Sequence, residues 1–221
     1  SISGSVTSTG TGPSPPKIDS GPISAPRRSI AVLPFVNMSG DAEQEYFADG
    51  LSEEILNSLT RIDGMQVAGR TSSFQFKGKD TPAREIGRQL GAGYVVEGSV
   101  RKAGNQVRIT AQLVKVADGF QVWSETFNRD LKDIFAVQDE IARRVAQVLQ
   151  LRIGEGEKLA AGATRNPAAY EVYLRGREAS NGEESGAREG VRLQQEAIGI
   201  DPGFALAHAA LADSYVALAK T

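Results

Sequence analysis

Apolar residues along the first half of the chain follow two spacings, one typical of strands and the other of helices. A short apolar run at 30–35 is typical of a buried strand. After it, apolar residues recur at every fourth position from Phe47 to Leu59, which places them on one face of a helix. A second strand is predicted at 65–68, and a second helix at 81–90. The pattern therefore predicts two successive strand-helix units.

Three further strands are predicted between residues 94 and 127. Apolar and polar residues alternate strictly in the middle one, which indicates a strand with one buried face. The alternation fails at Leu113-Val114, where we predict a bulge. Asp118-Gly119 is a typical hairpin turn and joins this strand to the last one.

The order of these elements predicts the fold class. We expect Thr81 to cap the second helix, with Pro82 in its first turn, and Asp133 to cap a third helix after the last strand. The order is then βαβαβββα. Because the last strands alternate as a one-sided sheet does, we predict an α+β fold with one mixed sheet and helices on one face. An all-α region follows.

Composition divides the chain into four segments. Residues 1–28 are rich in Ser, Gly and Pro, which predicts a disordered linker, either natural or a purification remnant. Residues 29–152 form the α/β domain. Residues 153–165 are rich in Gly and Ala and predict a joint, and residues 166–221 are helical.

The helical region carries the pattern of a known repeat. His208, Leu211, Ala212 and Tyr215 have the spacing of the tetratricopeptide (TPR) motif, and Pro202 closes the unit before them. The region thus resembles the start of a TPR array, with a plain helical bundle as the alternative. The resemblance implies a protein or peptide partner on the helical surface. Six candidate interaction residues follow from it: Tyr170, Tyr173, His208, Leu211, Tyr215 and Leu218.

The α/β region resembles the amino-terminal domain of TolB. Segments 29–35, 46–51, 94–101 and 123–127 carry this resemblance in order along the chain. In similar proteins the domain follows a class III adenylate or guanylate cyclase domain or a winged-helix DNA-binding domain. The resemblance implies the carboxy-terminal part of a bacterial signalling protein of one of these kinds. It favours a periplasmic part of a membrane-anchored parent over the cytoplasm, with membrane contact only through a segment upstream of this chain.

Composition narrows the possible chemistry. The 221 residues include no cysteine and one histidine, and the formal net charge is −2. Thiolate chemistry and cysteine-ligated zinc are therefore excluded, and a basic excess that would favour nucleic acid is missing. His208 is expected at an interior position of a helix, where it cannot complete a Ser-His-Asp set. We predict no catalytic, cofactor-binding or metal-binding residue, no cofactor and no nucleic-acid partner in this part of the protein.

Two polar segments suggest sites only faintly. Residues 76–81 are similar to a phosphate-binding loop, but Ser73 replaces its first glycine and Asp80 replaces its Ser/Thr. We expect no nucleotide there. Carboxylate pairs such as Glu53-Glu54 are expected to form a solvated helix face.

Three functions remain. The preferred one is a non-catalytic binding and relay module of a signalling protein. A structural oligomerisation unit is an alternative, because the last helix at 204–220 presents Leu211, Tyr215 and Leu218 with no following helix to cover them. They are expected either to pair with a second chain, giving a homodimer, or to pack on the α/β domain. An enzyme with an unrecognised site is the third possibility.

Overall fold

The structure is a computed structural model that describes residues 28–151, 162, 164–180 and 184–219. The predicted linker at 1–28, except Arg28, and most of the predicted joint at 153–165 lie outside the described residues. The division into four segments therefore stays a prediction.

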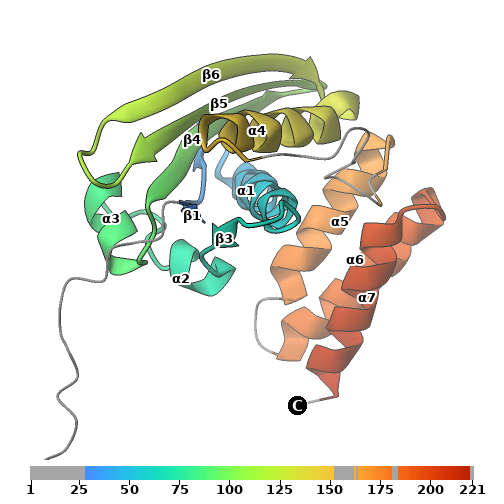
Figure 1. The fold of residues 1–221 in the computed structure, drawn as a ribbon. Coiled ribbons are helices and arrows are strands. Elements are labelled where there is room, and N and C mark those ends of the chain that lie inside the picture. Colours follow the sequence, from blue (N-terminus) through green and yellow to red (C-terminus); the bar gives the residue numbers. More distant parts are fainter. Residues whose placement is uncertain (1–27, 152–161, 163, 181–183, 220–221) are drawn as a thin grey trace, which may run out of the picture.

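Six strands form one mixed sheet (Figure 1). They are β1 (Ser29–Val32), β2 (Val36–Asn37), β3 (Gln66–Val67), β4 (Tyr94–Ala103), β5 (Gln106–Lys115) and β6 (Gln121–Asp130). The order is β3-β1-β4-β5-β6, and β2 pairs with β4. Strands β3, β1 and β4 run parallel, whereas β4, β5 and β6 form an antiparallel meander. The predicted bulge is confirmed by a register shift between Leu113 and Val114.

Seven helices accompany the sheet in the described part of the chain. They are α1 (Glu45–Thr60), α2 (Arg70–Phe74), α3 (Ala83–Gln89), α4 (Ile134–Val148), α5 (Pro167–Ser180), α6 (Glu184–Ile200) and α7 (Ala205–Leu218). Short 3-10 turns, Ala42–Gln44 and Leu131–Asp133, lead into α1 and α4. The predicted α+β class with a following helical region is confirmed. Sequence patterns missed β2 and α2, which are too short to show a period.

The long helices α1 and α4 cover one face of the sheet (Figure 1). The short helix α3 lies on the other face, where Ile86 packs with Val95 and Val116. The prediction that the helices share one face of the sheet is therefore wrong for α3. Gly87 allows this approach, because a Cβ there would come within 2.2 Å of Val116 Cγ2. The central strand β4 has apolar neighbours on both faces at Val95 and Val96, and so supports a helix on each side.

The caps of α3 and α4 differ in detail from those predicted. Pro82, not Thr81, occupies the cap position of α3, since its ψ of 139° is extended and the helix begins at Ala83. Asp133 does precede α4, but its side chain makes no capping hydrogen bond. The preceding 3-10 turn takes over this role, because Ile134 N–H already donates to Leu131.

Helix α5 packs against α1, whereas α6 and α7 pack against α5, and all three helices contribute to the hydrophobic core of α1 and α4. Phe204 and Ala207, at the start of α7, belong to the same buried cluster as Phe47 of α1. No helix within the described ranges is long and apolar enough to cross a membrane.

Candidate functional site

The contact between the sheet domain and the helical region is built around two tyrosines of α5. Tyr170 and Tyr173 are each 1% exposed. The Tyr170 ring meets Phe47 of α1 edge-on at 6.1 Å between centroids, and Phe135 of α4 at 4.8 Å. Both tyrosines were candidate interaction residues. The structure places them inside the chain, where they join the two regions to each other.

The buried Tyr170 hydroxyl has one partner from the sheet domain. Gln138 Nε2 of α4 donates to it at 2.9 Å, and Gln138 itself is fully buried. Burial raises the pKa of Tyr170 well above its usual value, so the hydroxyl stays protonated. This hydrogen bond fixes the rotation of α5 against α4, since breaking it would leave a polar group without a partner in the core.

An ionic cluster lies next to the tyrosines, and we call Glu53, Glu54, Arg70, Tyr173 and Arg177 the latch cluster. Glu54 accepts from the Tyr173 hydroxyl at 2.8 Å and from Arg177 at 3.1 Å. Arg177 also donates to Glu53, which pairs with Arg70 at 3.0 Å. Two carboxylates of α1 are therefore held by cations from α5 and α2.

The latch cluster corrects the expectation that Glu53 and Glu54 form a solvated face. They are 7% and 6% exposed. Burial raises the pKa of the Glu54 carboxyl, and the charge of Arg177 acts against this rise. The sequence could not show it, because Arg177 lies 124 residues after Glu53 and no local pattern links them.

Further contacts tighten the same boundary. Lys102 of β4 pairs with Glu171 of α5 at 2.5 Å. Gly50 lets Leu174 approach α1, because a Cβ at Gly50 would lie 2.4 Å from Leu174 Cδ2. The boundary combines buried aromatic rings, hydrogen bonds and ion pairs. It therefore sets one relative orientation of α5 and α1.

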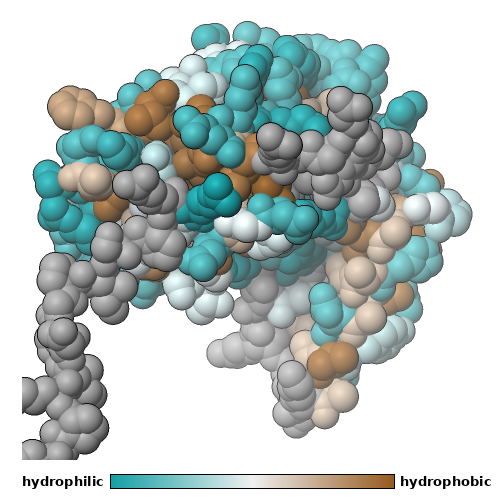
Figure 2. All heavy atoms as spheres, viewed as in Figure 1, coloured by the Kyte–Doolittle hydropathy of each residue, from teal (hydrophilic) through white to brown (hydrophobic). Residues whose placement is uncertain are grey.

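The other four candidate residues lie on α7, away from this boundary. Leu211 and Leu218 are half-buried, and Tyr215 is 49% exposed. His208 was expected at an interior position but is exposed, and its Nε2 lies 3.0 Å from the Pro202 carbonyl oxygen. Figure 2 shows tan and brown atoms along the outer surface of α7. Val216, 53% exposed, adds to this apolar surface, although the sequence analysis did not select it.

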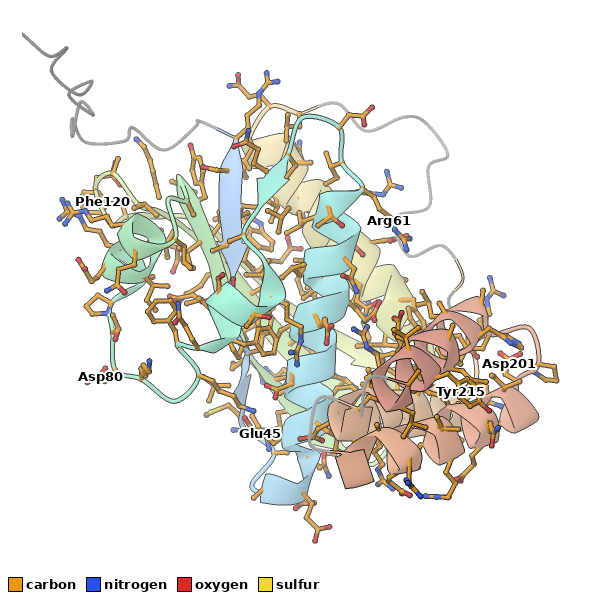
Figure 3. The ribbon with its side chains drawn as sticks, turned by 90° about the horizontal axis from the view of Figure 1, so that it is seen from below. Glu45, Arg61, Asp80, Phe120, Asp201 and Tyr215 are labelled. Carbon is orange, nitrogen blue, oxygen red and sulfur yellow. The ribbon has the colours of Figure 1, made fainter. Side chains whose placement is uncertain are left out.

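The segment 76–81 forms one wall of a cavity on the α3 side of the sheet. Asp80, on this segment, lies on the opposite side of α1 from Tyr215 and Asp201 of the helical region (Figure 3). No group of three or more His, Asp or Glu side chains suited to a metal ion occurs in the described part of the chain.

A family model described as HilA/YgeH-like transcriptional regulator, second domain, matches residues 26–144. This is more than half of the chain. The chain belongs to this HilA/YgeH-like family. It is also 45% identical over 186 residues to "Putative adenylate cyclase 3" of Rhizobium meliloti (strain 1021), which covers 83% of this chain. The chain spans only 32% of that relative's length. The HilA/YgeH-like domain described here is thus a module of regulatory proteins.

Two solved bacterial structures are similar to this HilA/YgeH-like chain. Lipoprotein GNA1162 of Neisseria meningitidis is 21% identical, with a TM-score of 0.40 over 47% of this chain and 80% of its own. TolB of Acinetobacter baumannii is 20% identical, also with a TM-score of 0.40, over 55% of this chain and 28% of its own.

Proposed function

We propose that this chain is a non-catalytic binding and relay module of a bacterial signalling protein. The outer face of α7 binds a protein or peptide, and the latch cluster passes the effect to the sheet domain. One observation carries the proposal. The inner side of the helical region is fixed to α1 and α4 by buried polar contacts, whereas α7 keeps Tyr215 and Val216 at the surface.

The composition of α7 supports a docking role. Alanine, leucine, tyrosine and valine occupy most of its 14 positions, and its exposed face carries Tyr215 and Val216 beside alanines, with His208 and Asp213 as the polar residues. A helix that is apolar on all sides is normally buried. In a TPR array a neighbouring helix packs on such a face, and a helix of a partner protein or peptide would pack on α7 in the same way.

The relay has a direct route through the start of α7. The Phe204 ring lies 4.9 Å from that of Tyr173 and 6.4 Å from that of Phe135 on α4. Further along, the Ser214 and Ser180 hydroxyls of α7 and α5 are 2.8 Å apart. A partner that shifts α7 would therefore act on Tyr173, a member of the latch cluster.

The relatives also support a proposal about the longer protein that contains this module. Its output is nucleotide cyclisation or transcriptional regulation, supported by the cyclase-named relative and by the regulator family. We further propose that this module is the periplasmic part of a membrane-anchored parent. A phosphatase fused after this module should be active if it is exported, and inactivity of the fusion would contradict the location.

Site-specific photocrosslinking tests the docking role. A photoreactive side chain at Val216 should crosslink to one partner polypeptide, whereas the same group at Asn128 on β6 should not. Adding Tyr215→Ser should weaken the Val216 crosslink. Identical products from both positions would contradict the proposal.

Self-association through α7 is the second candidate function, favoured by the same exposed Tyr215 and Val216. Two copies related by a two-fold axis would cover both faces. Light scattering at several concentrations should then give a dimer that Tyr215→Ser with Val216→Ser converts to a monomer. A monomer at every concentration would exclude this candidate and leave the partner-binding role.

A further inference from the structure

We propose that the cavity beside segment 76–81 binds a free α-amino acid with an apolar side chain. The inference goes beyond the docking role of α7 and does not depend on it. The cavity has a volume of about 470 Å³ and lies at the end of β1, over the face of the sheet that carries α3. Small-molecule sites have cavities of roughly 300–1,000 Å³.

The floor of the cavity is polar and belongs to two neighbouring strands, β4 and β5. Glu97 and Ser99 come from β4, and Thr110 and Gln112 from β5. All four alternate with residues buried under α1 and α4, so they are directed to the opposite face. Gln112 Nε2 donates to Glu97 Oε1 at 2.5 Å. This bond orients the carboxylate and leaves its second oxygen for a ligand.

Two lysines lie on the rim of the cavity, and they differ in whether a carboxylate pairs with them. Lys77 is occupied, since it pairs with Asp49 at 2.6 Å and Glu45 at 3.1 Å. Lys79 lies 5.5 Å from the centre of the Phe76 ring, and no carboxylate among the described residues is within 4.0 Å of its Nζ. Gly78, with a φ of +68°, turns the chain between the two lysines.

The remaining wall is apolar. Leu33, Phe76 and Ile86 line the cavity and are 7%, 8% and 2% exposed. Val36, 59% exposed, lines the same cavity and offers apolar area that a hydrocarbon side chain would remove from water.

The charges define the ligand. One cavity holds a carboxylate, Glu97, and an ammonium, Lys79, that are not paired with each other. A zwitterion satisfies both: its ammonium donates to Glu97 and its carboxylate accepts from Lys79. A simple anion such as phosphate would gain Lys79 but would face the charge of Glu97. The apolar wall then selects an amino acid with a side chain like that of leucine.

Calorimetry on the full chain with L-leucine tests the inference. Two probes of the same shape separate the charges: 3-methylbutan-1-amine lacks the carboxylate and 4-methylpentanoate lacks the ammonium. We expect L-leucine to bind at least about tenfold more tightly than either, since a hydrogen bond to a charged group contributes about that factor. Glu97→Gln and Lys79→Met should each weaken L-leucine binding by about tenfold or more.

Matched controls lie outside the cavity. Glu85→Gln on α3 and Lys132→Met before α4 make the same chemical changes and should leave affinity unchanged. Circular dichroism would verify that each variant is folded. Failure of L-leucine to bind at millimolar concentration overturns the inference. Equal binding of 4-methylpentanoate or phosphate, insensitive to Glu97→Gln, would also overturn it, because the site would then accept any anion at Lys79.

Discussion

Helices α5 and α7 belong to the same three-helix region, yet they use their aromatic residues in opposite ways. Tyr170 on α5 is buried, and its hydroxyl has a partner on α4. Tyr215 on α7 is 49% exposed, and its hydroxyl accepts from the exposed side chain of Gln195. The difference shows that residue type does not distinguish an internal contact from a surface. The partners on the facing element do.

The largest loss of stability is expected when the ring at the centre of the contact between α5, α1 and α4 is removed. Tyr170→Ala should lower the free energy of unfolding by about 3–5 kcal/mol, because it leaves a cavity between α1 and α4 and removes the partner of Gln138. Urea unfolding measures it. Tyr215→Ala is the matched control and should change stability by no more than about 0.5 kcal/mol. Similar losses for both variants would contradict the contrast between the helices.

The second effect breaks the latch cluster. Arg177→Met should cost about 3 kcal/mol, because it leaves Glu53 and Glu54 buried without their shared cation. Arg192→Met on α6 is the control. That arginine also pairs with two glutamates, Glu189 and Glu196, but its side chain is 58% exposed. Its loss should cost less than about 1 kcal/mol in the same unfolding experiment. Equal costs would show that burial of the cluster contributes nothing.

Alanine substitutions at two glycines should change the stability in opposite directions. Gly50→Ala should destabilise by about 1–2 kcal/mol, since the new methyl group would collide with Leu174 across the boundary. Gly199→Ala on α6 meets nothing within 4 Å and should stabilise by about 0.5–1 kcal/mol through helix propensity. Thermal unfolding of both variants measures the signs. Stabilisation by Gly50→Ala would mean that Leu174 can move away freely.

The smallest effect is a dependence on pH. Burial raises the folded-state pKa of Glu54 above its unfolded value. A carboxyl group whose pKa is raised by folding stabilises the folded state. This stabilisation is fully present below the pKa of the unfolded state, near 4.5, and is lost as pH rises through the pKa of the folded state. Wild type should therefore gain stability relative to Glu54→Gln as pH falls from 7 toward 4.5. A difference that is constant over this range would contradict the assignment.

The parts of the fold that follow local patterns could be predicted from sequence. Alternation gave the meander and its bulge, and fourfold spacing gave α1, because each depends on residues within a few positions. The latch cluster could not be predicted, since Glu54 and Arg177 are 123 residues apart. The exposure of His208 was also missed, because a helix with apolar residues on every side has no pattern that marks its inner face.

The cavity also could not be predicted from the sequence, because its residues lie in separate segments. Segment 76–81 lacks the glycine and hydroxyl of a phosphate loop, so by itself it predicts no binding site. Its role depends on Glu97 and Gln112, which reach it only through the sheet. The site takes its charges from a loop and a strand, so no single segment of the sequence carries its pattern.

The double pairing of β4 has a consequence for the order of folding. Its antiparallel contacts with β5 are local, for Ala103 faces Gln106 across a tight turn. Its parallel contacts with β1 join Ile30 to Tyr94, so the whole α1 to α3 segment must be enclosed before they form. Closing a long loop costs entropy that a hairpin avoids, and hairpins form within about 1–10 μs. We expect pulsed hydrogen exchange to show protection of the β4–β5 amides ahead of those of β1, so that the meander acts as the template on which the parallel half assembles.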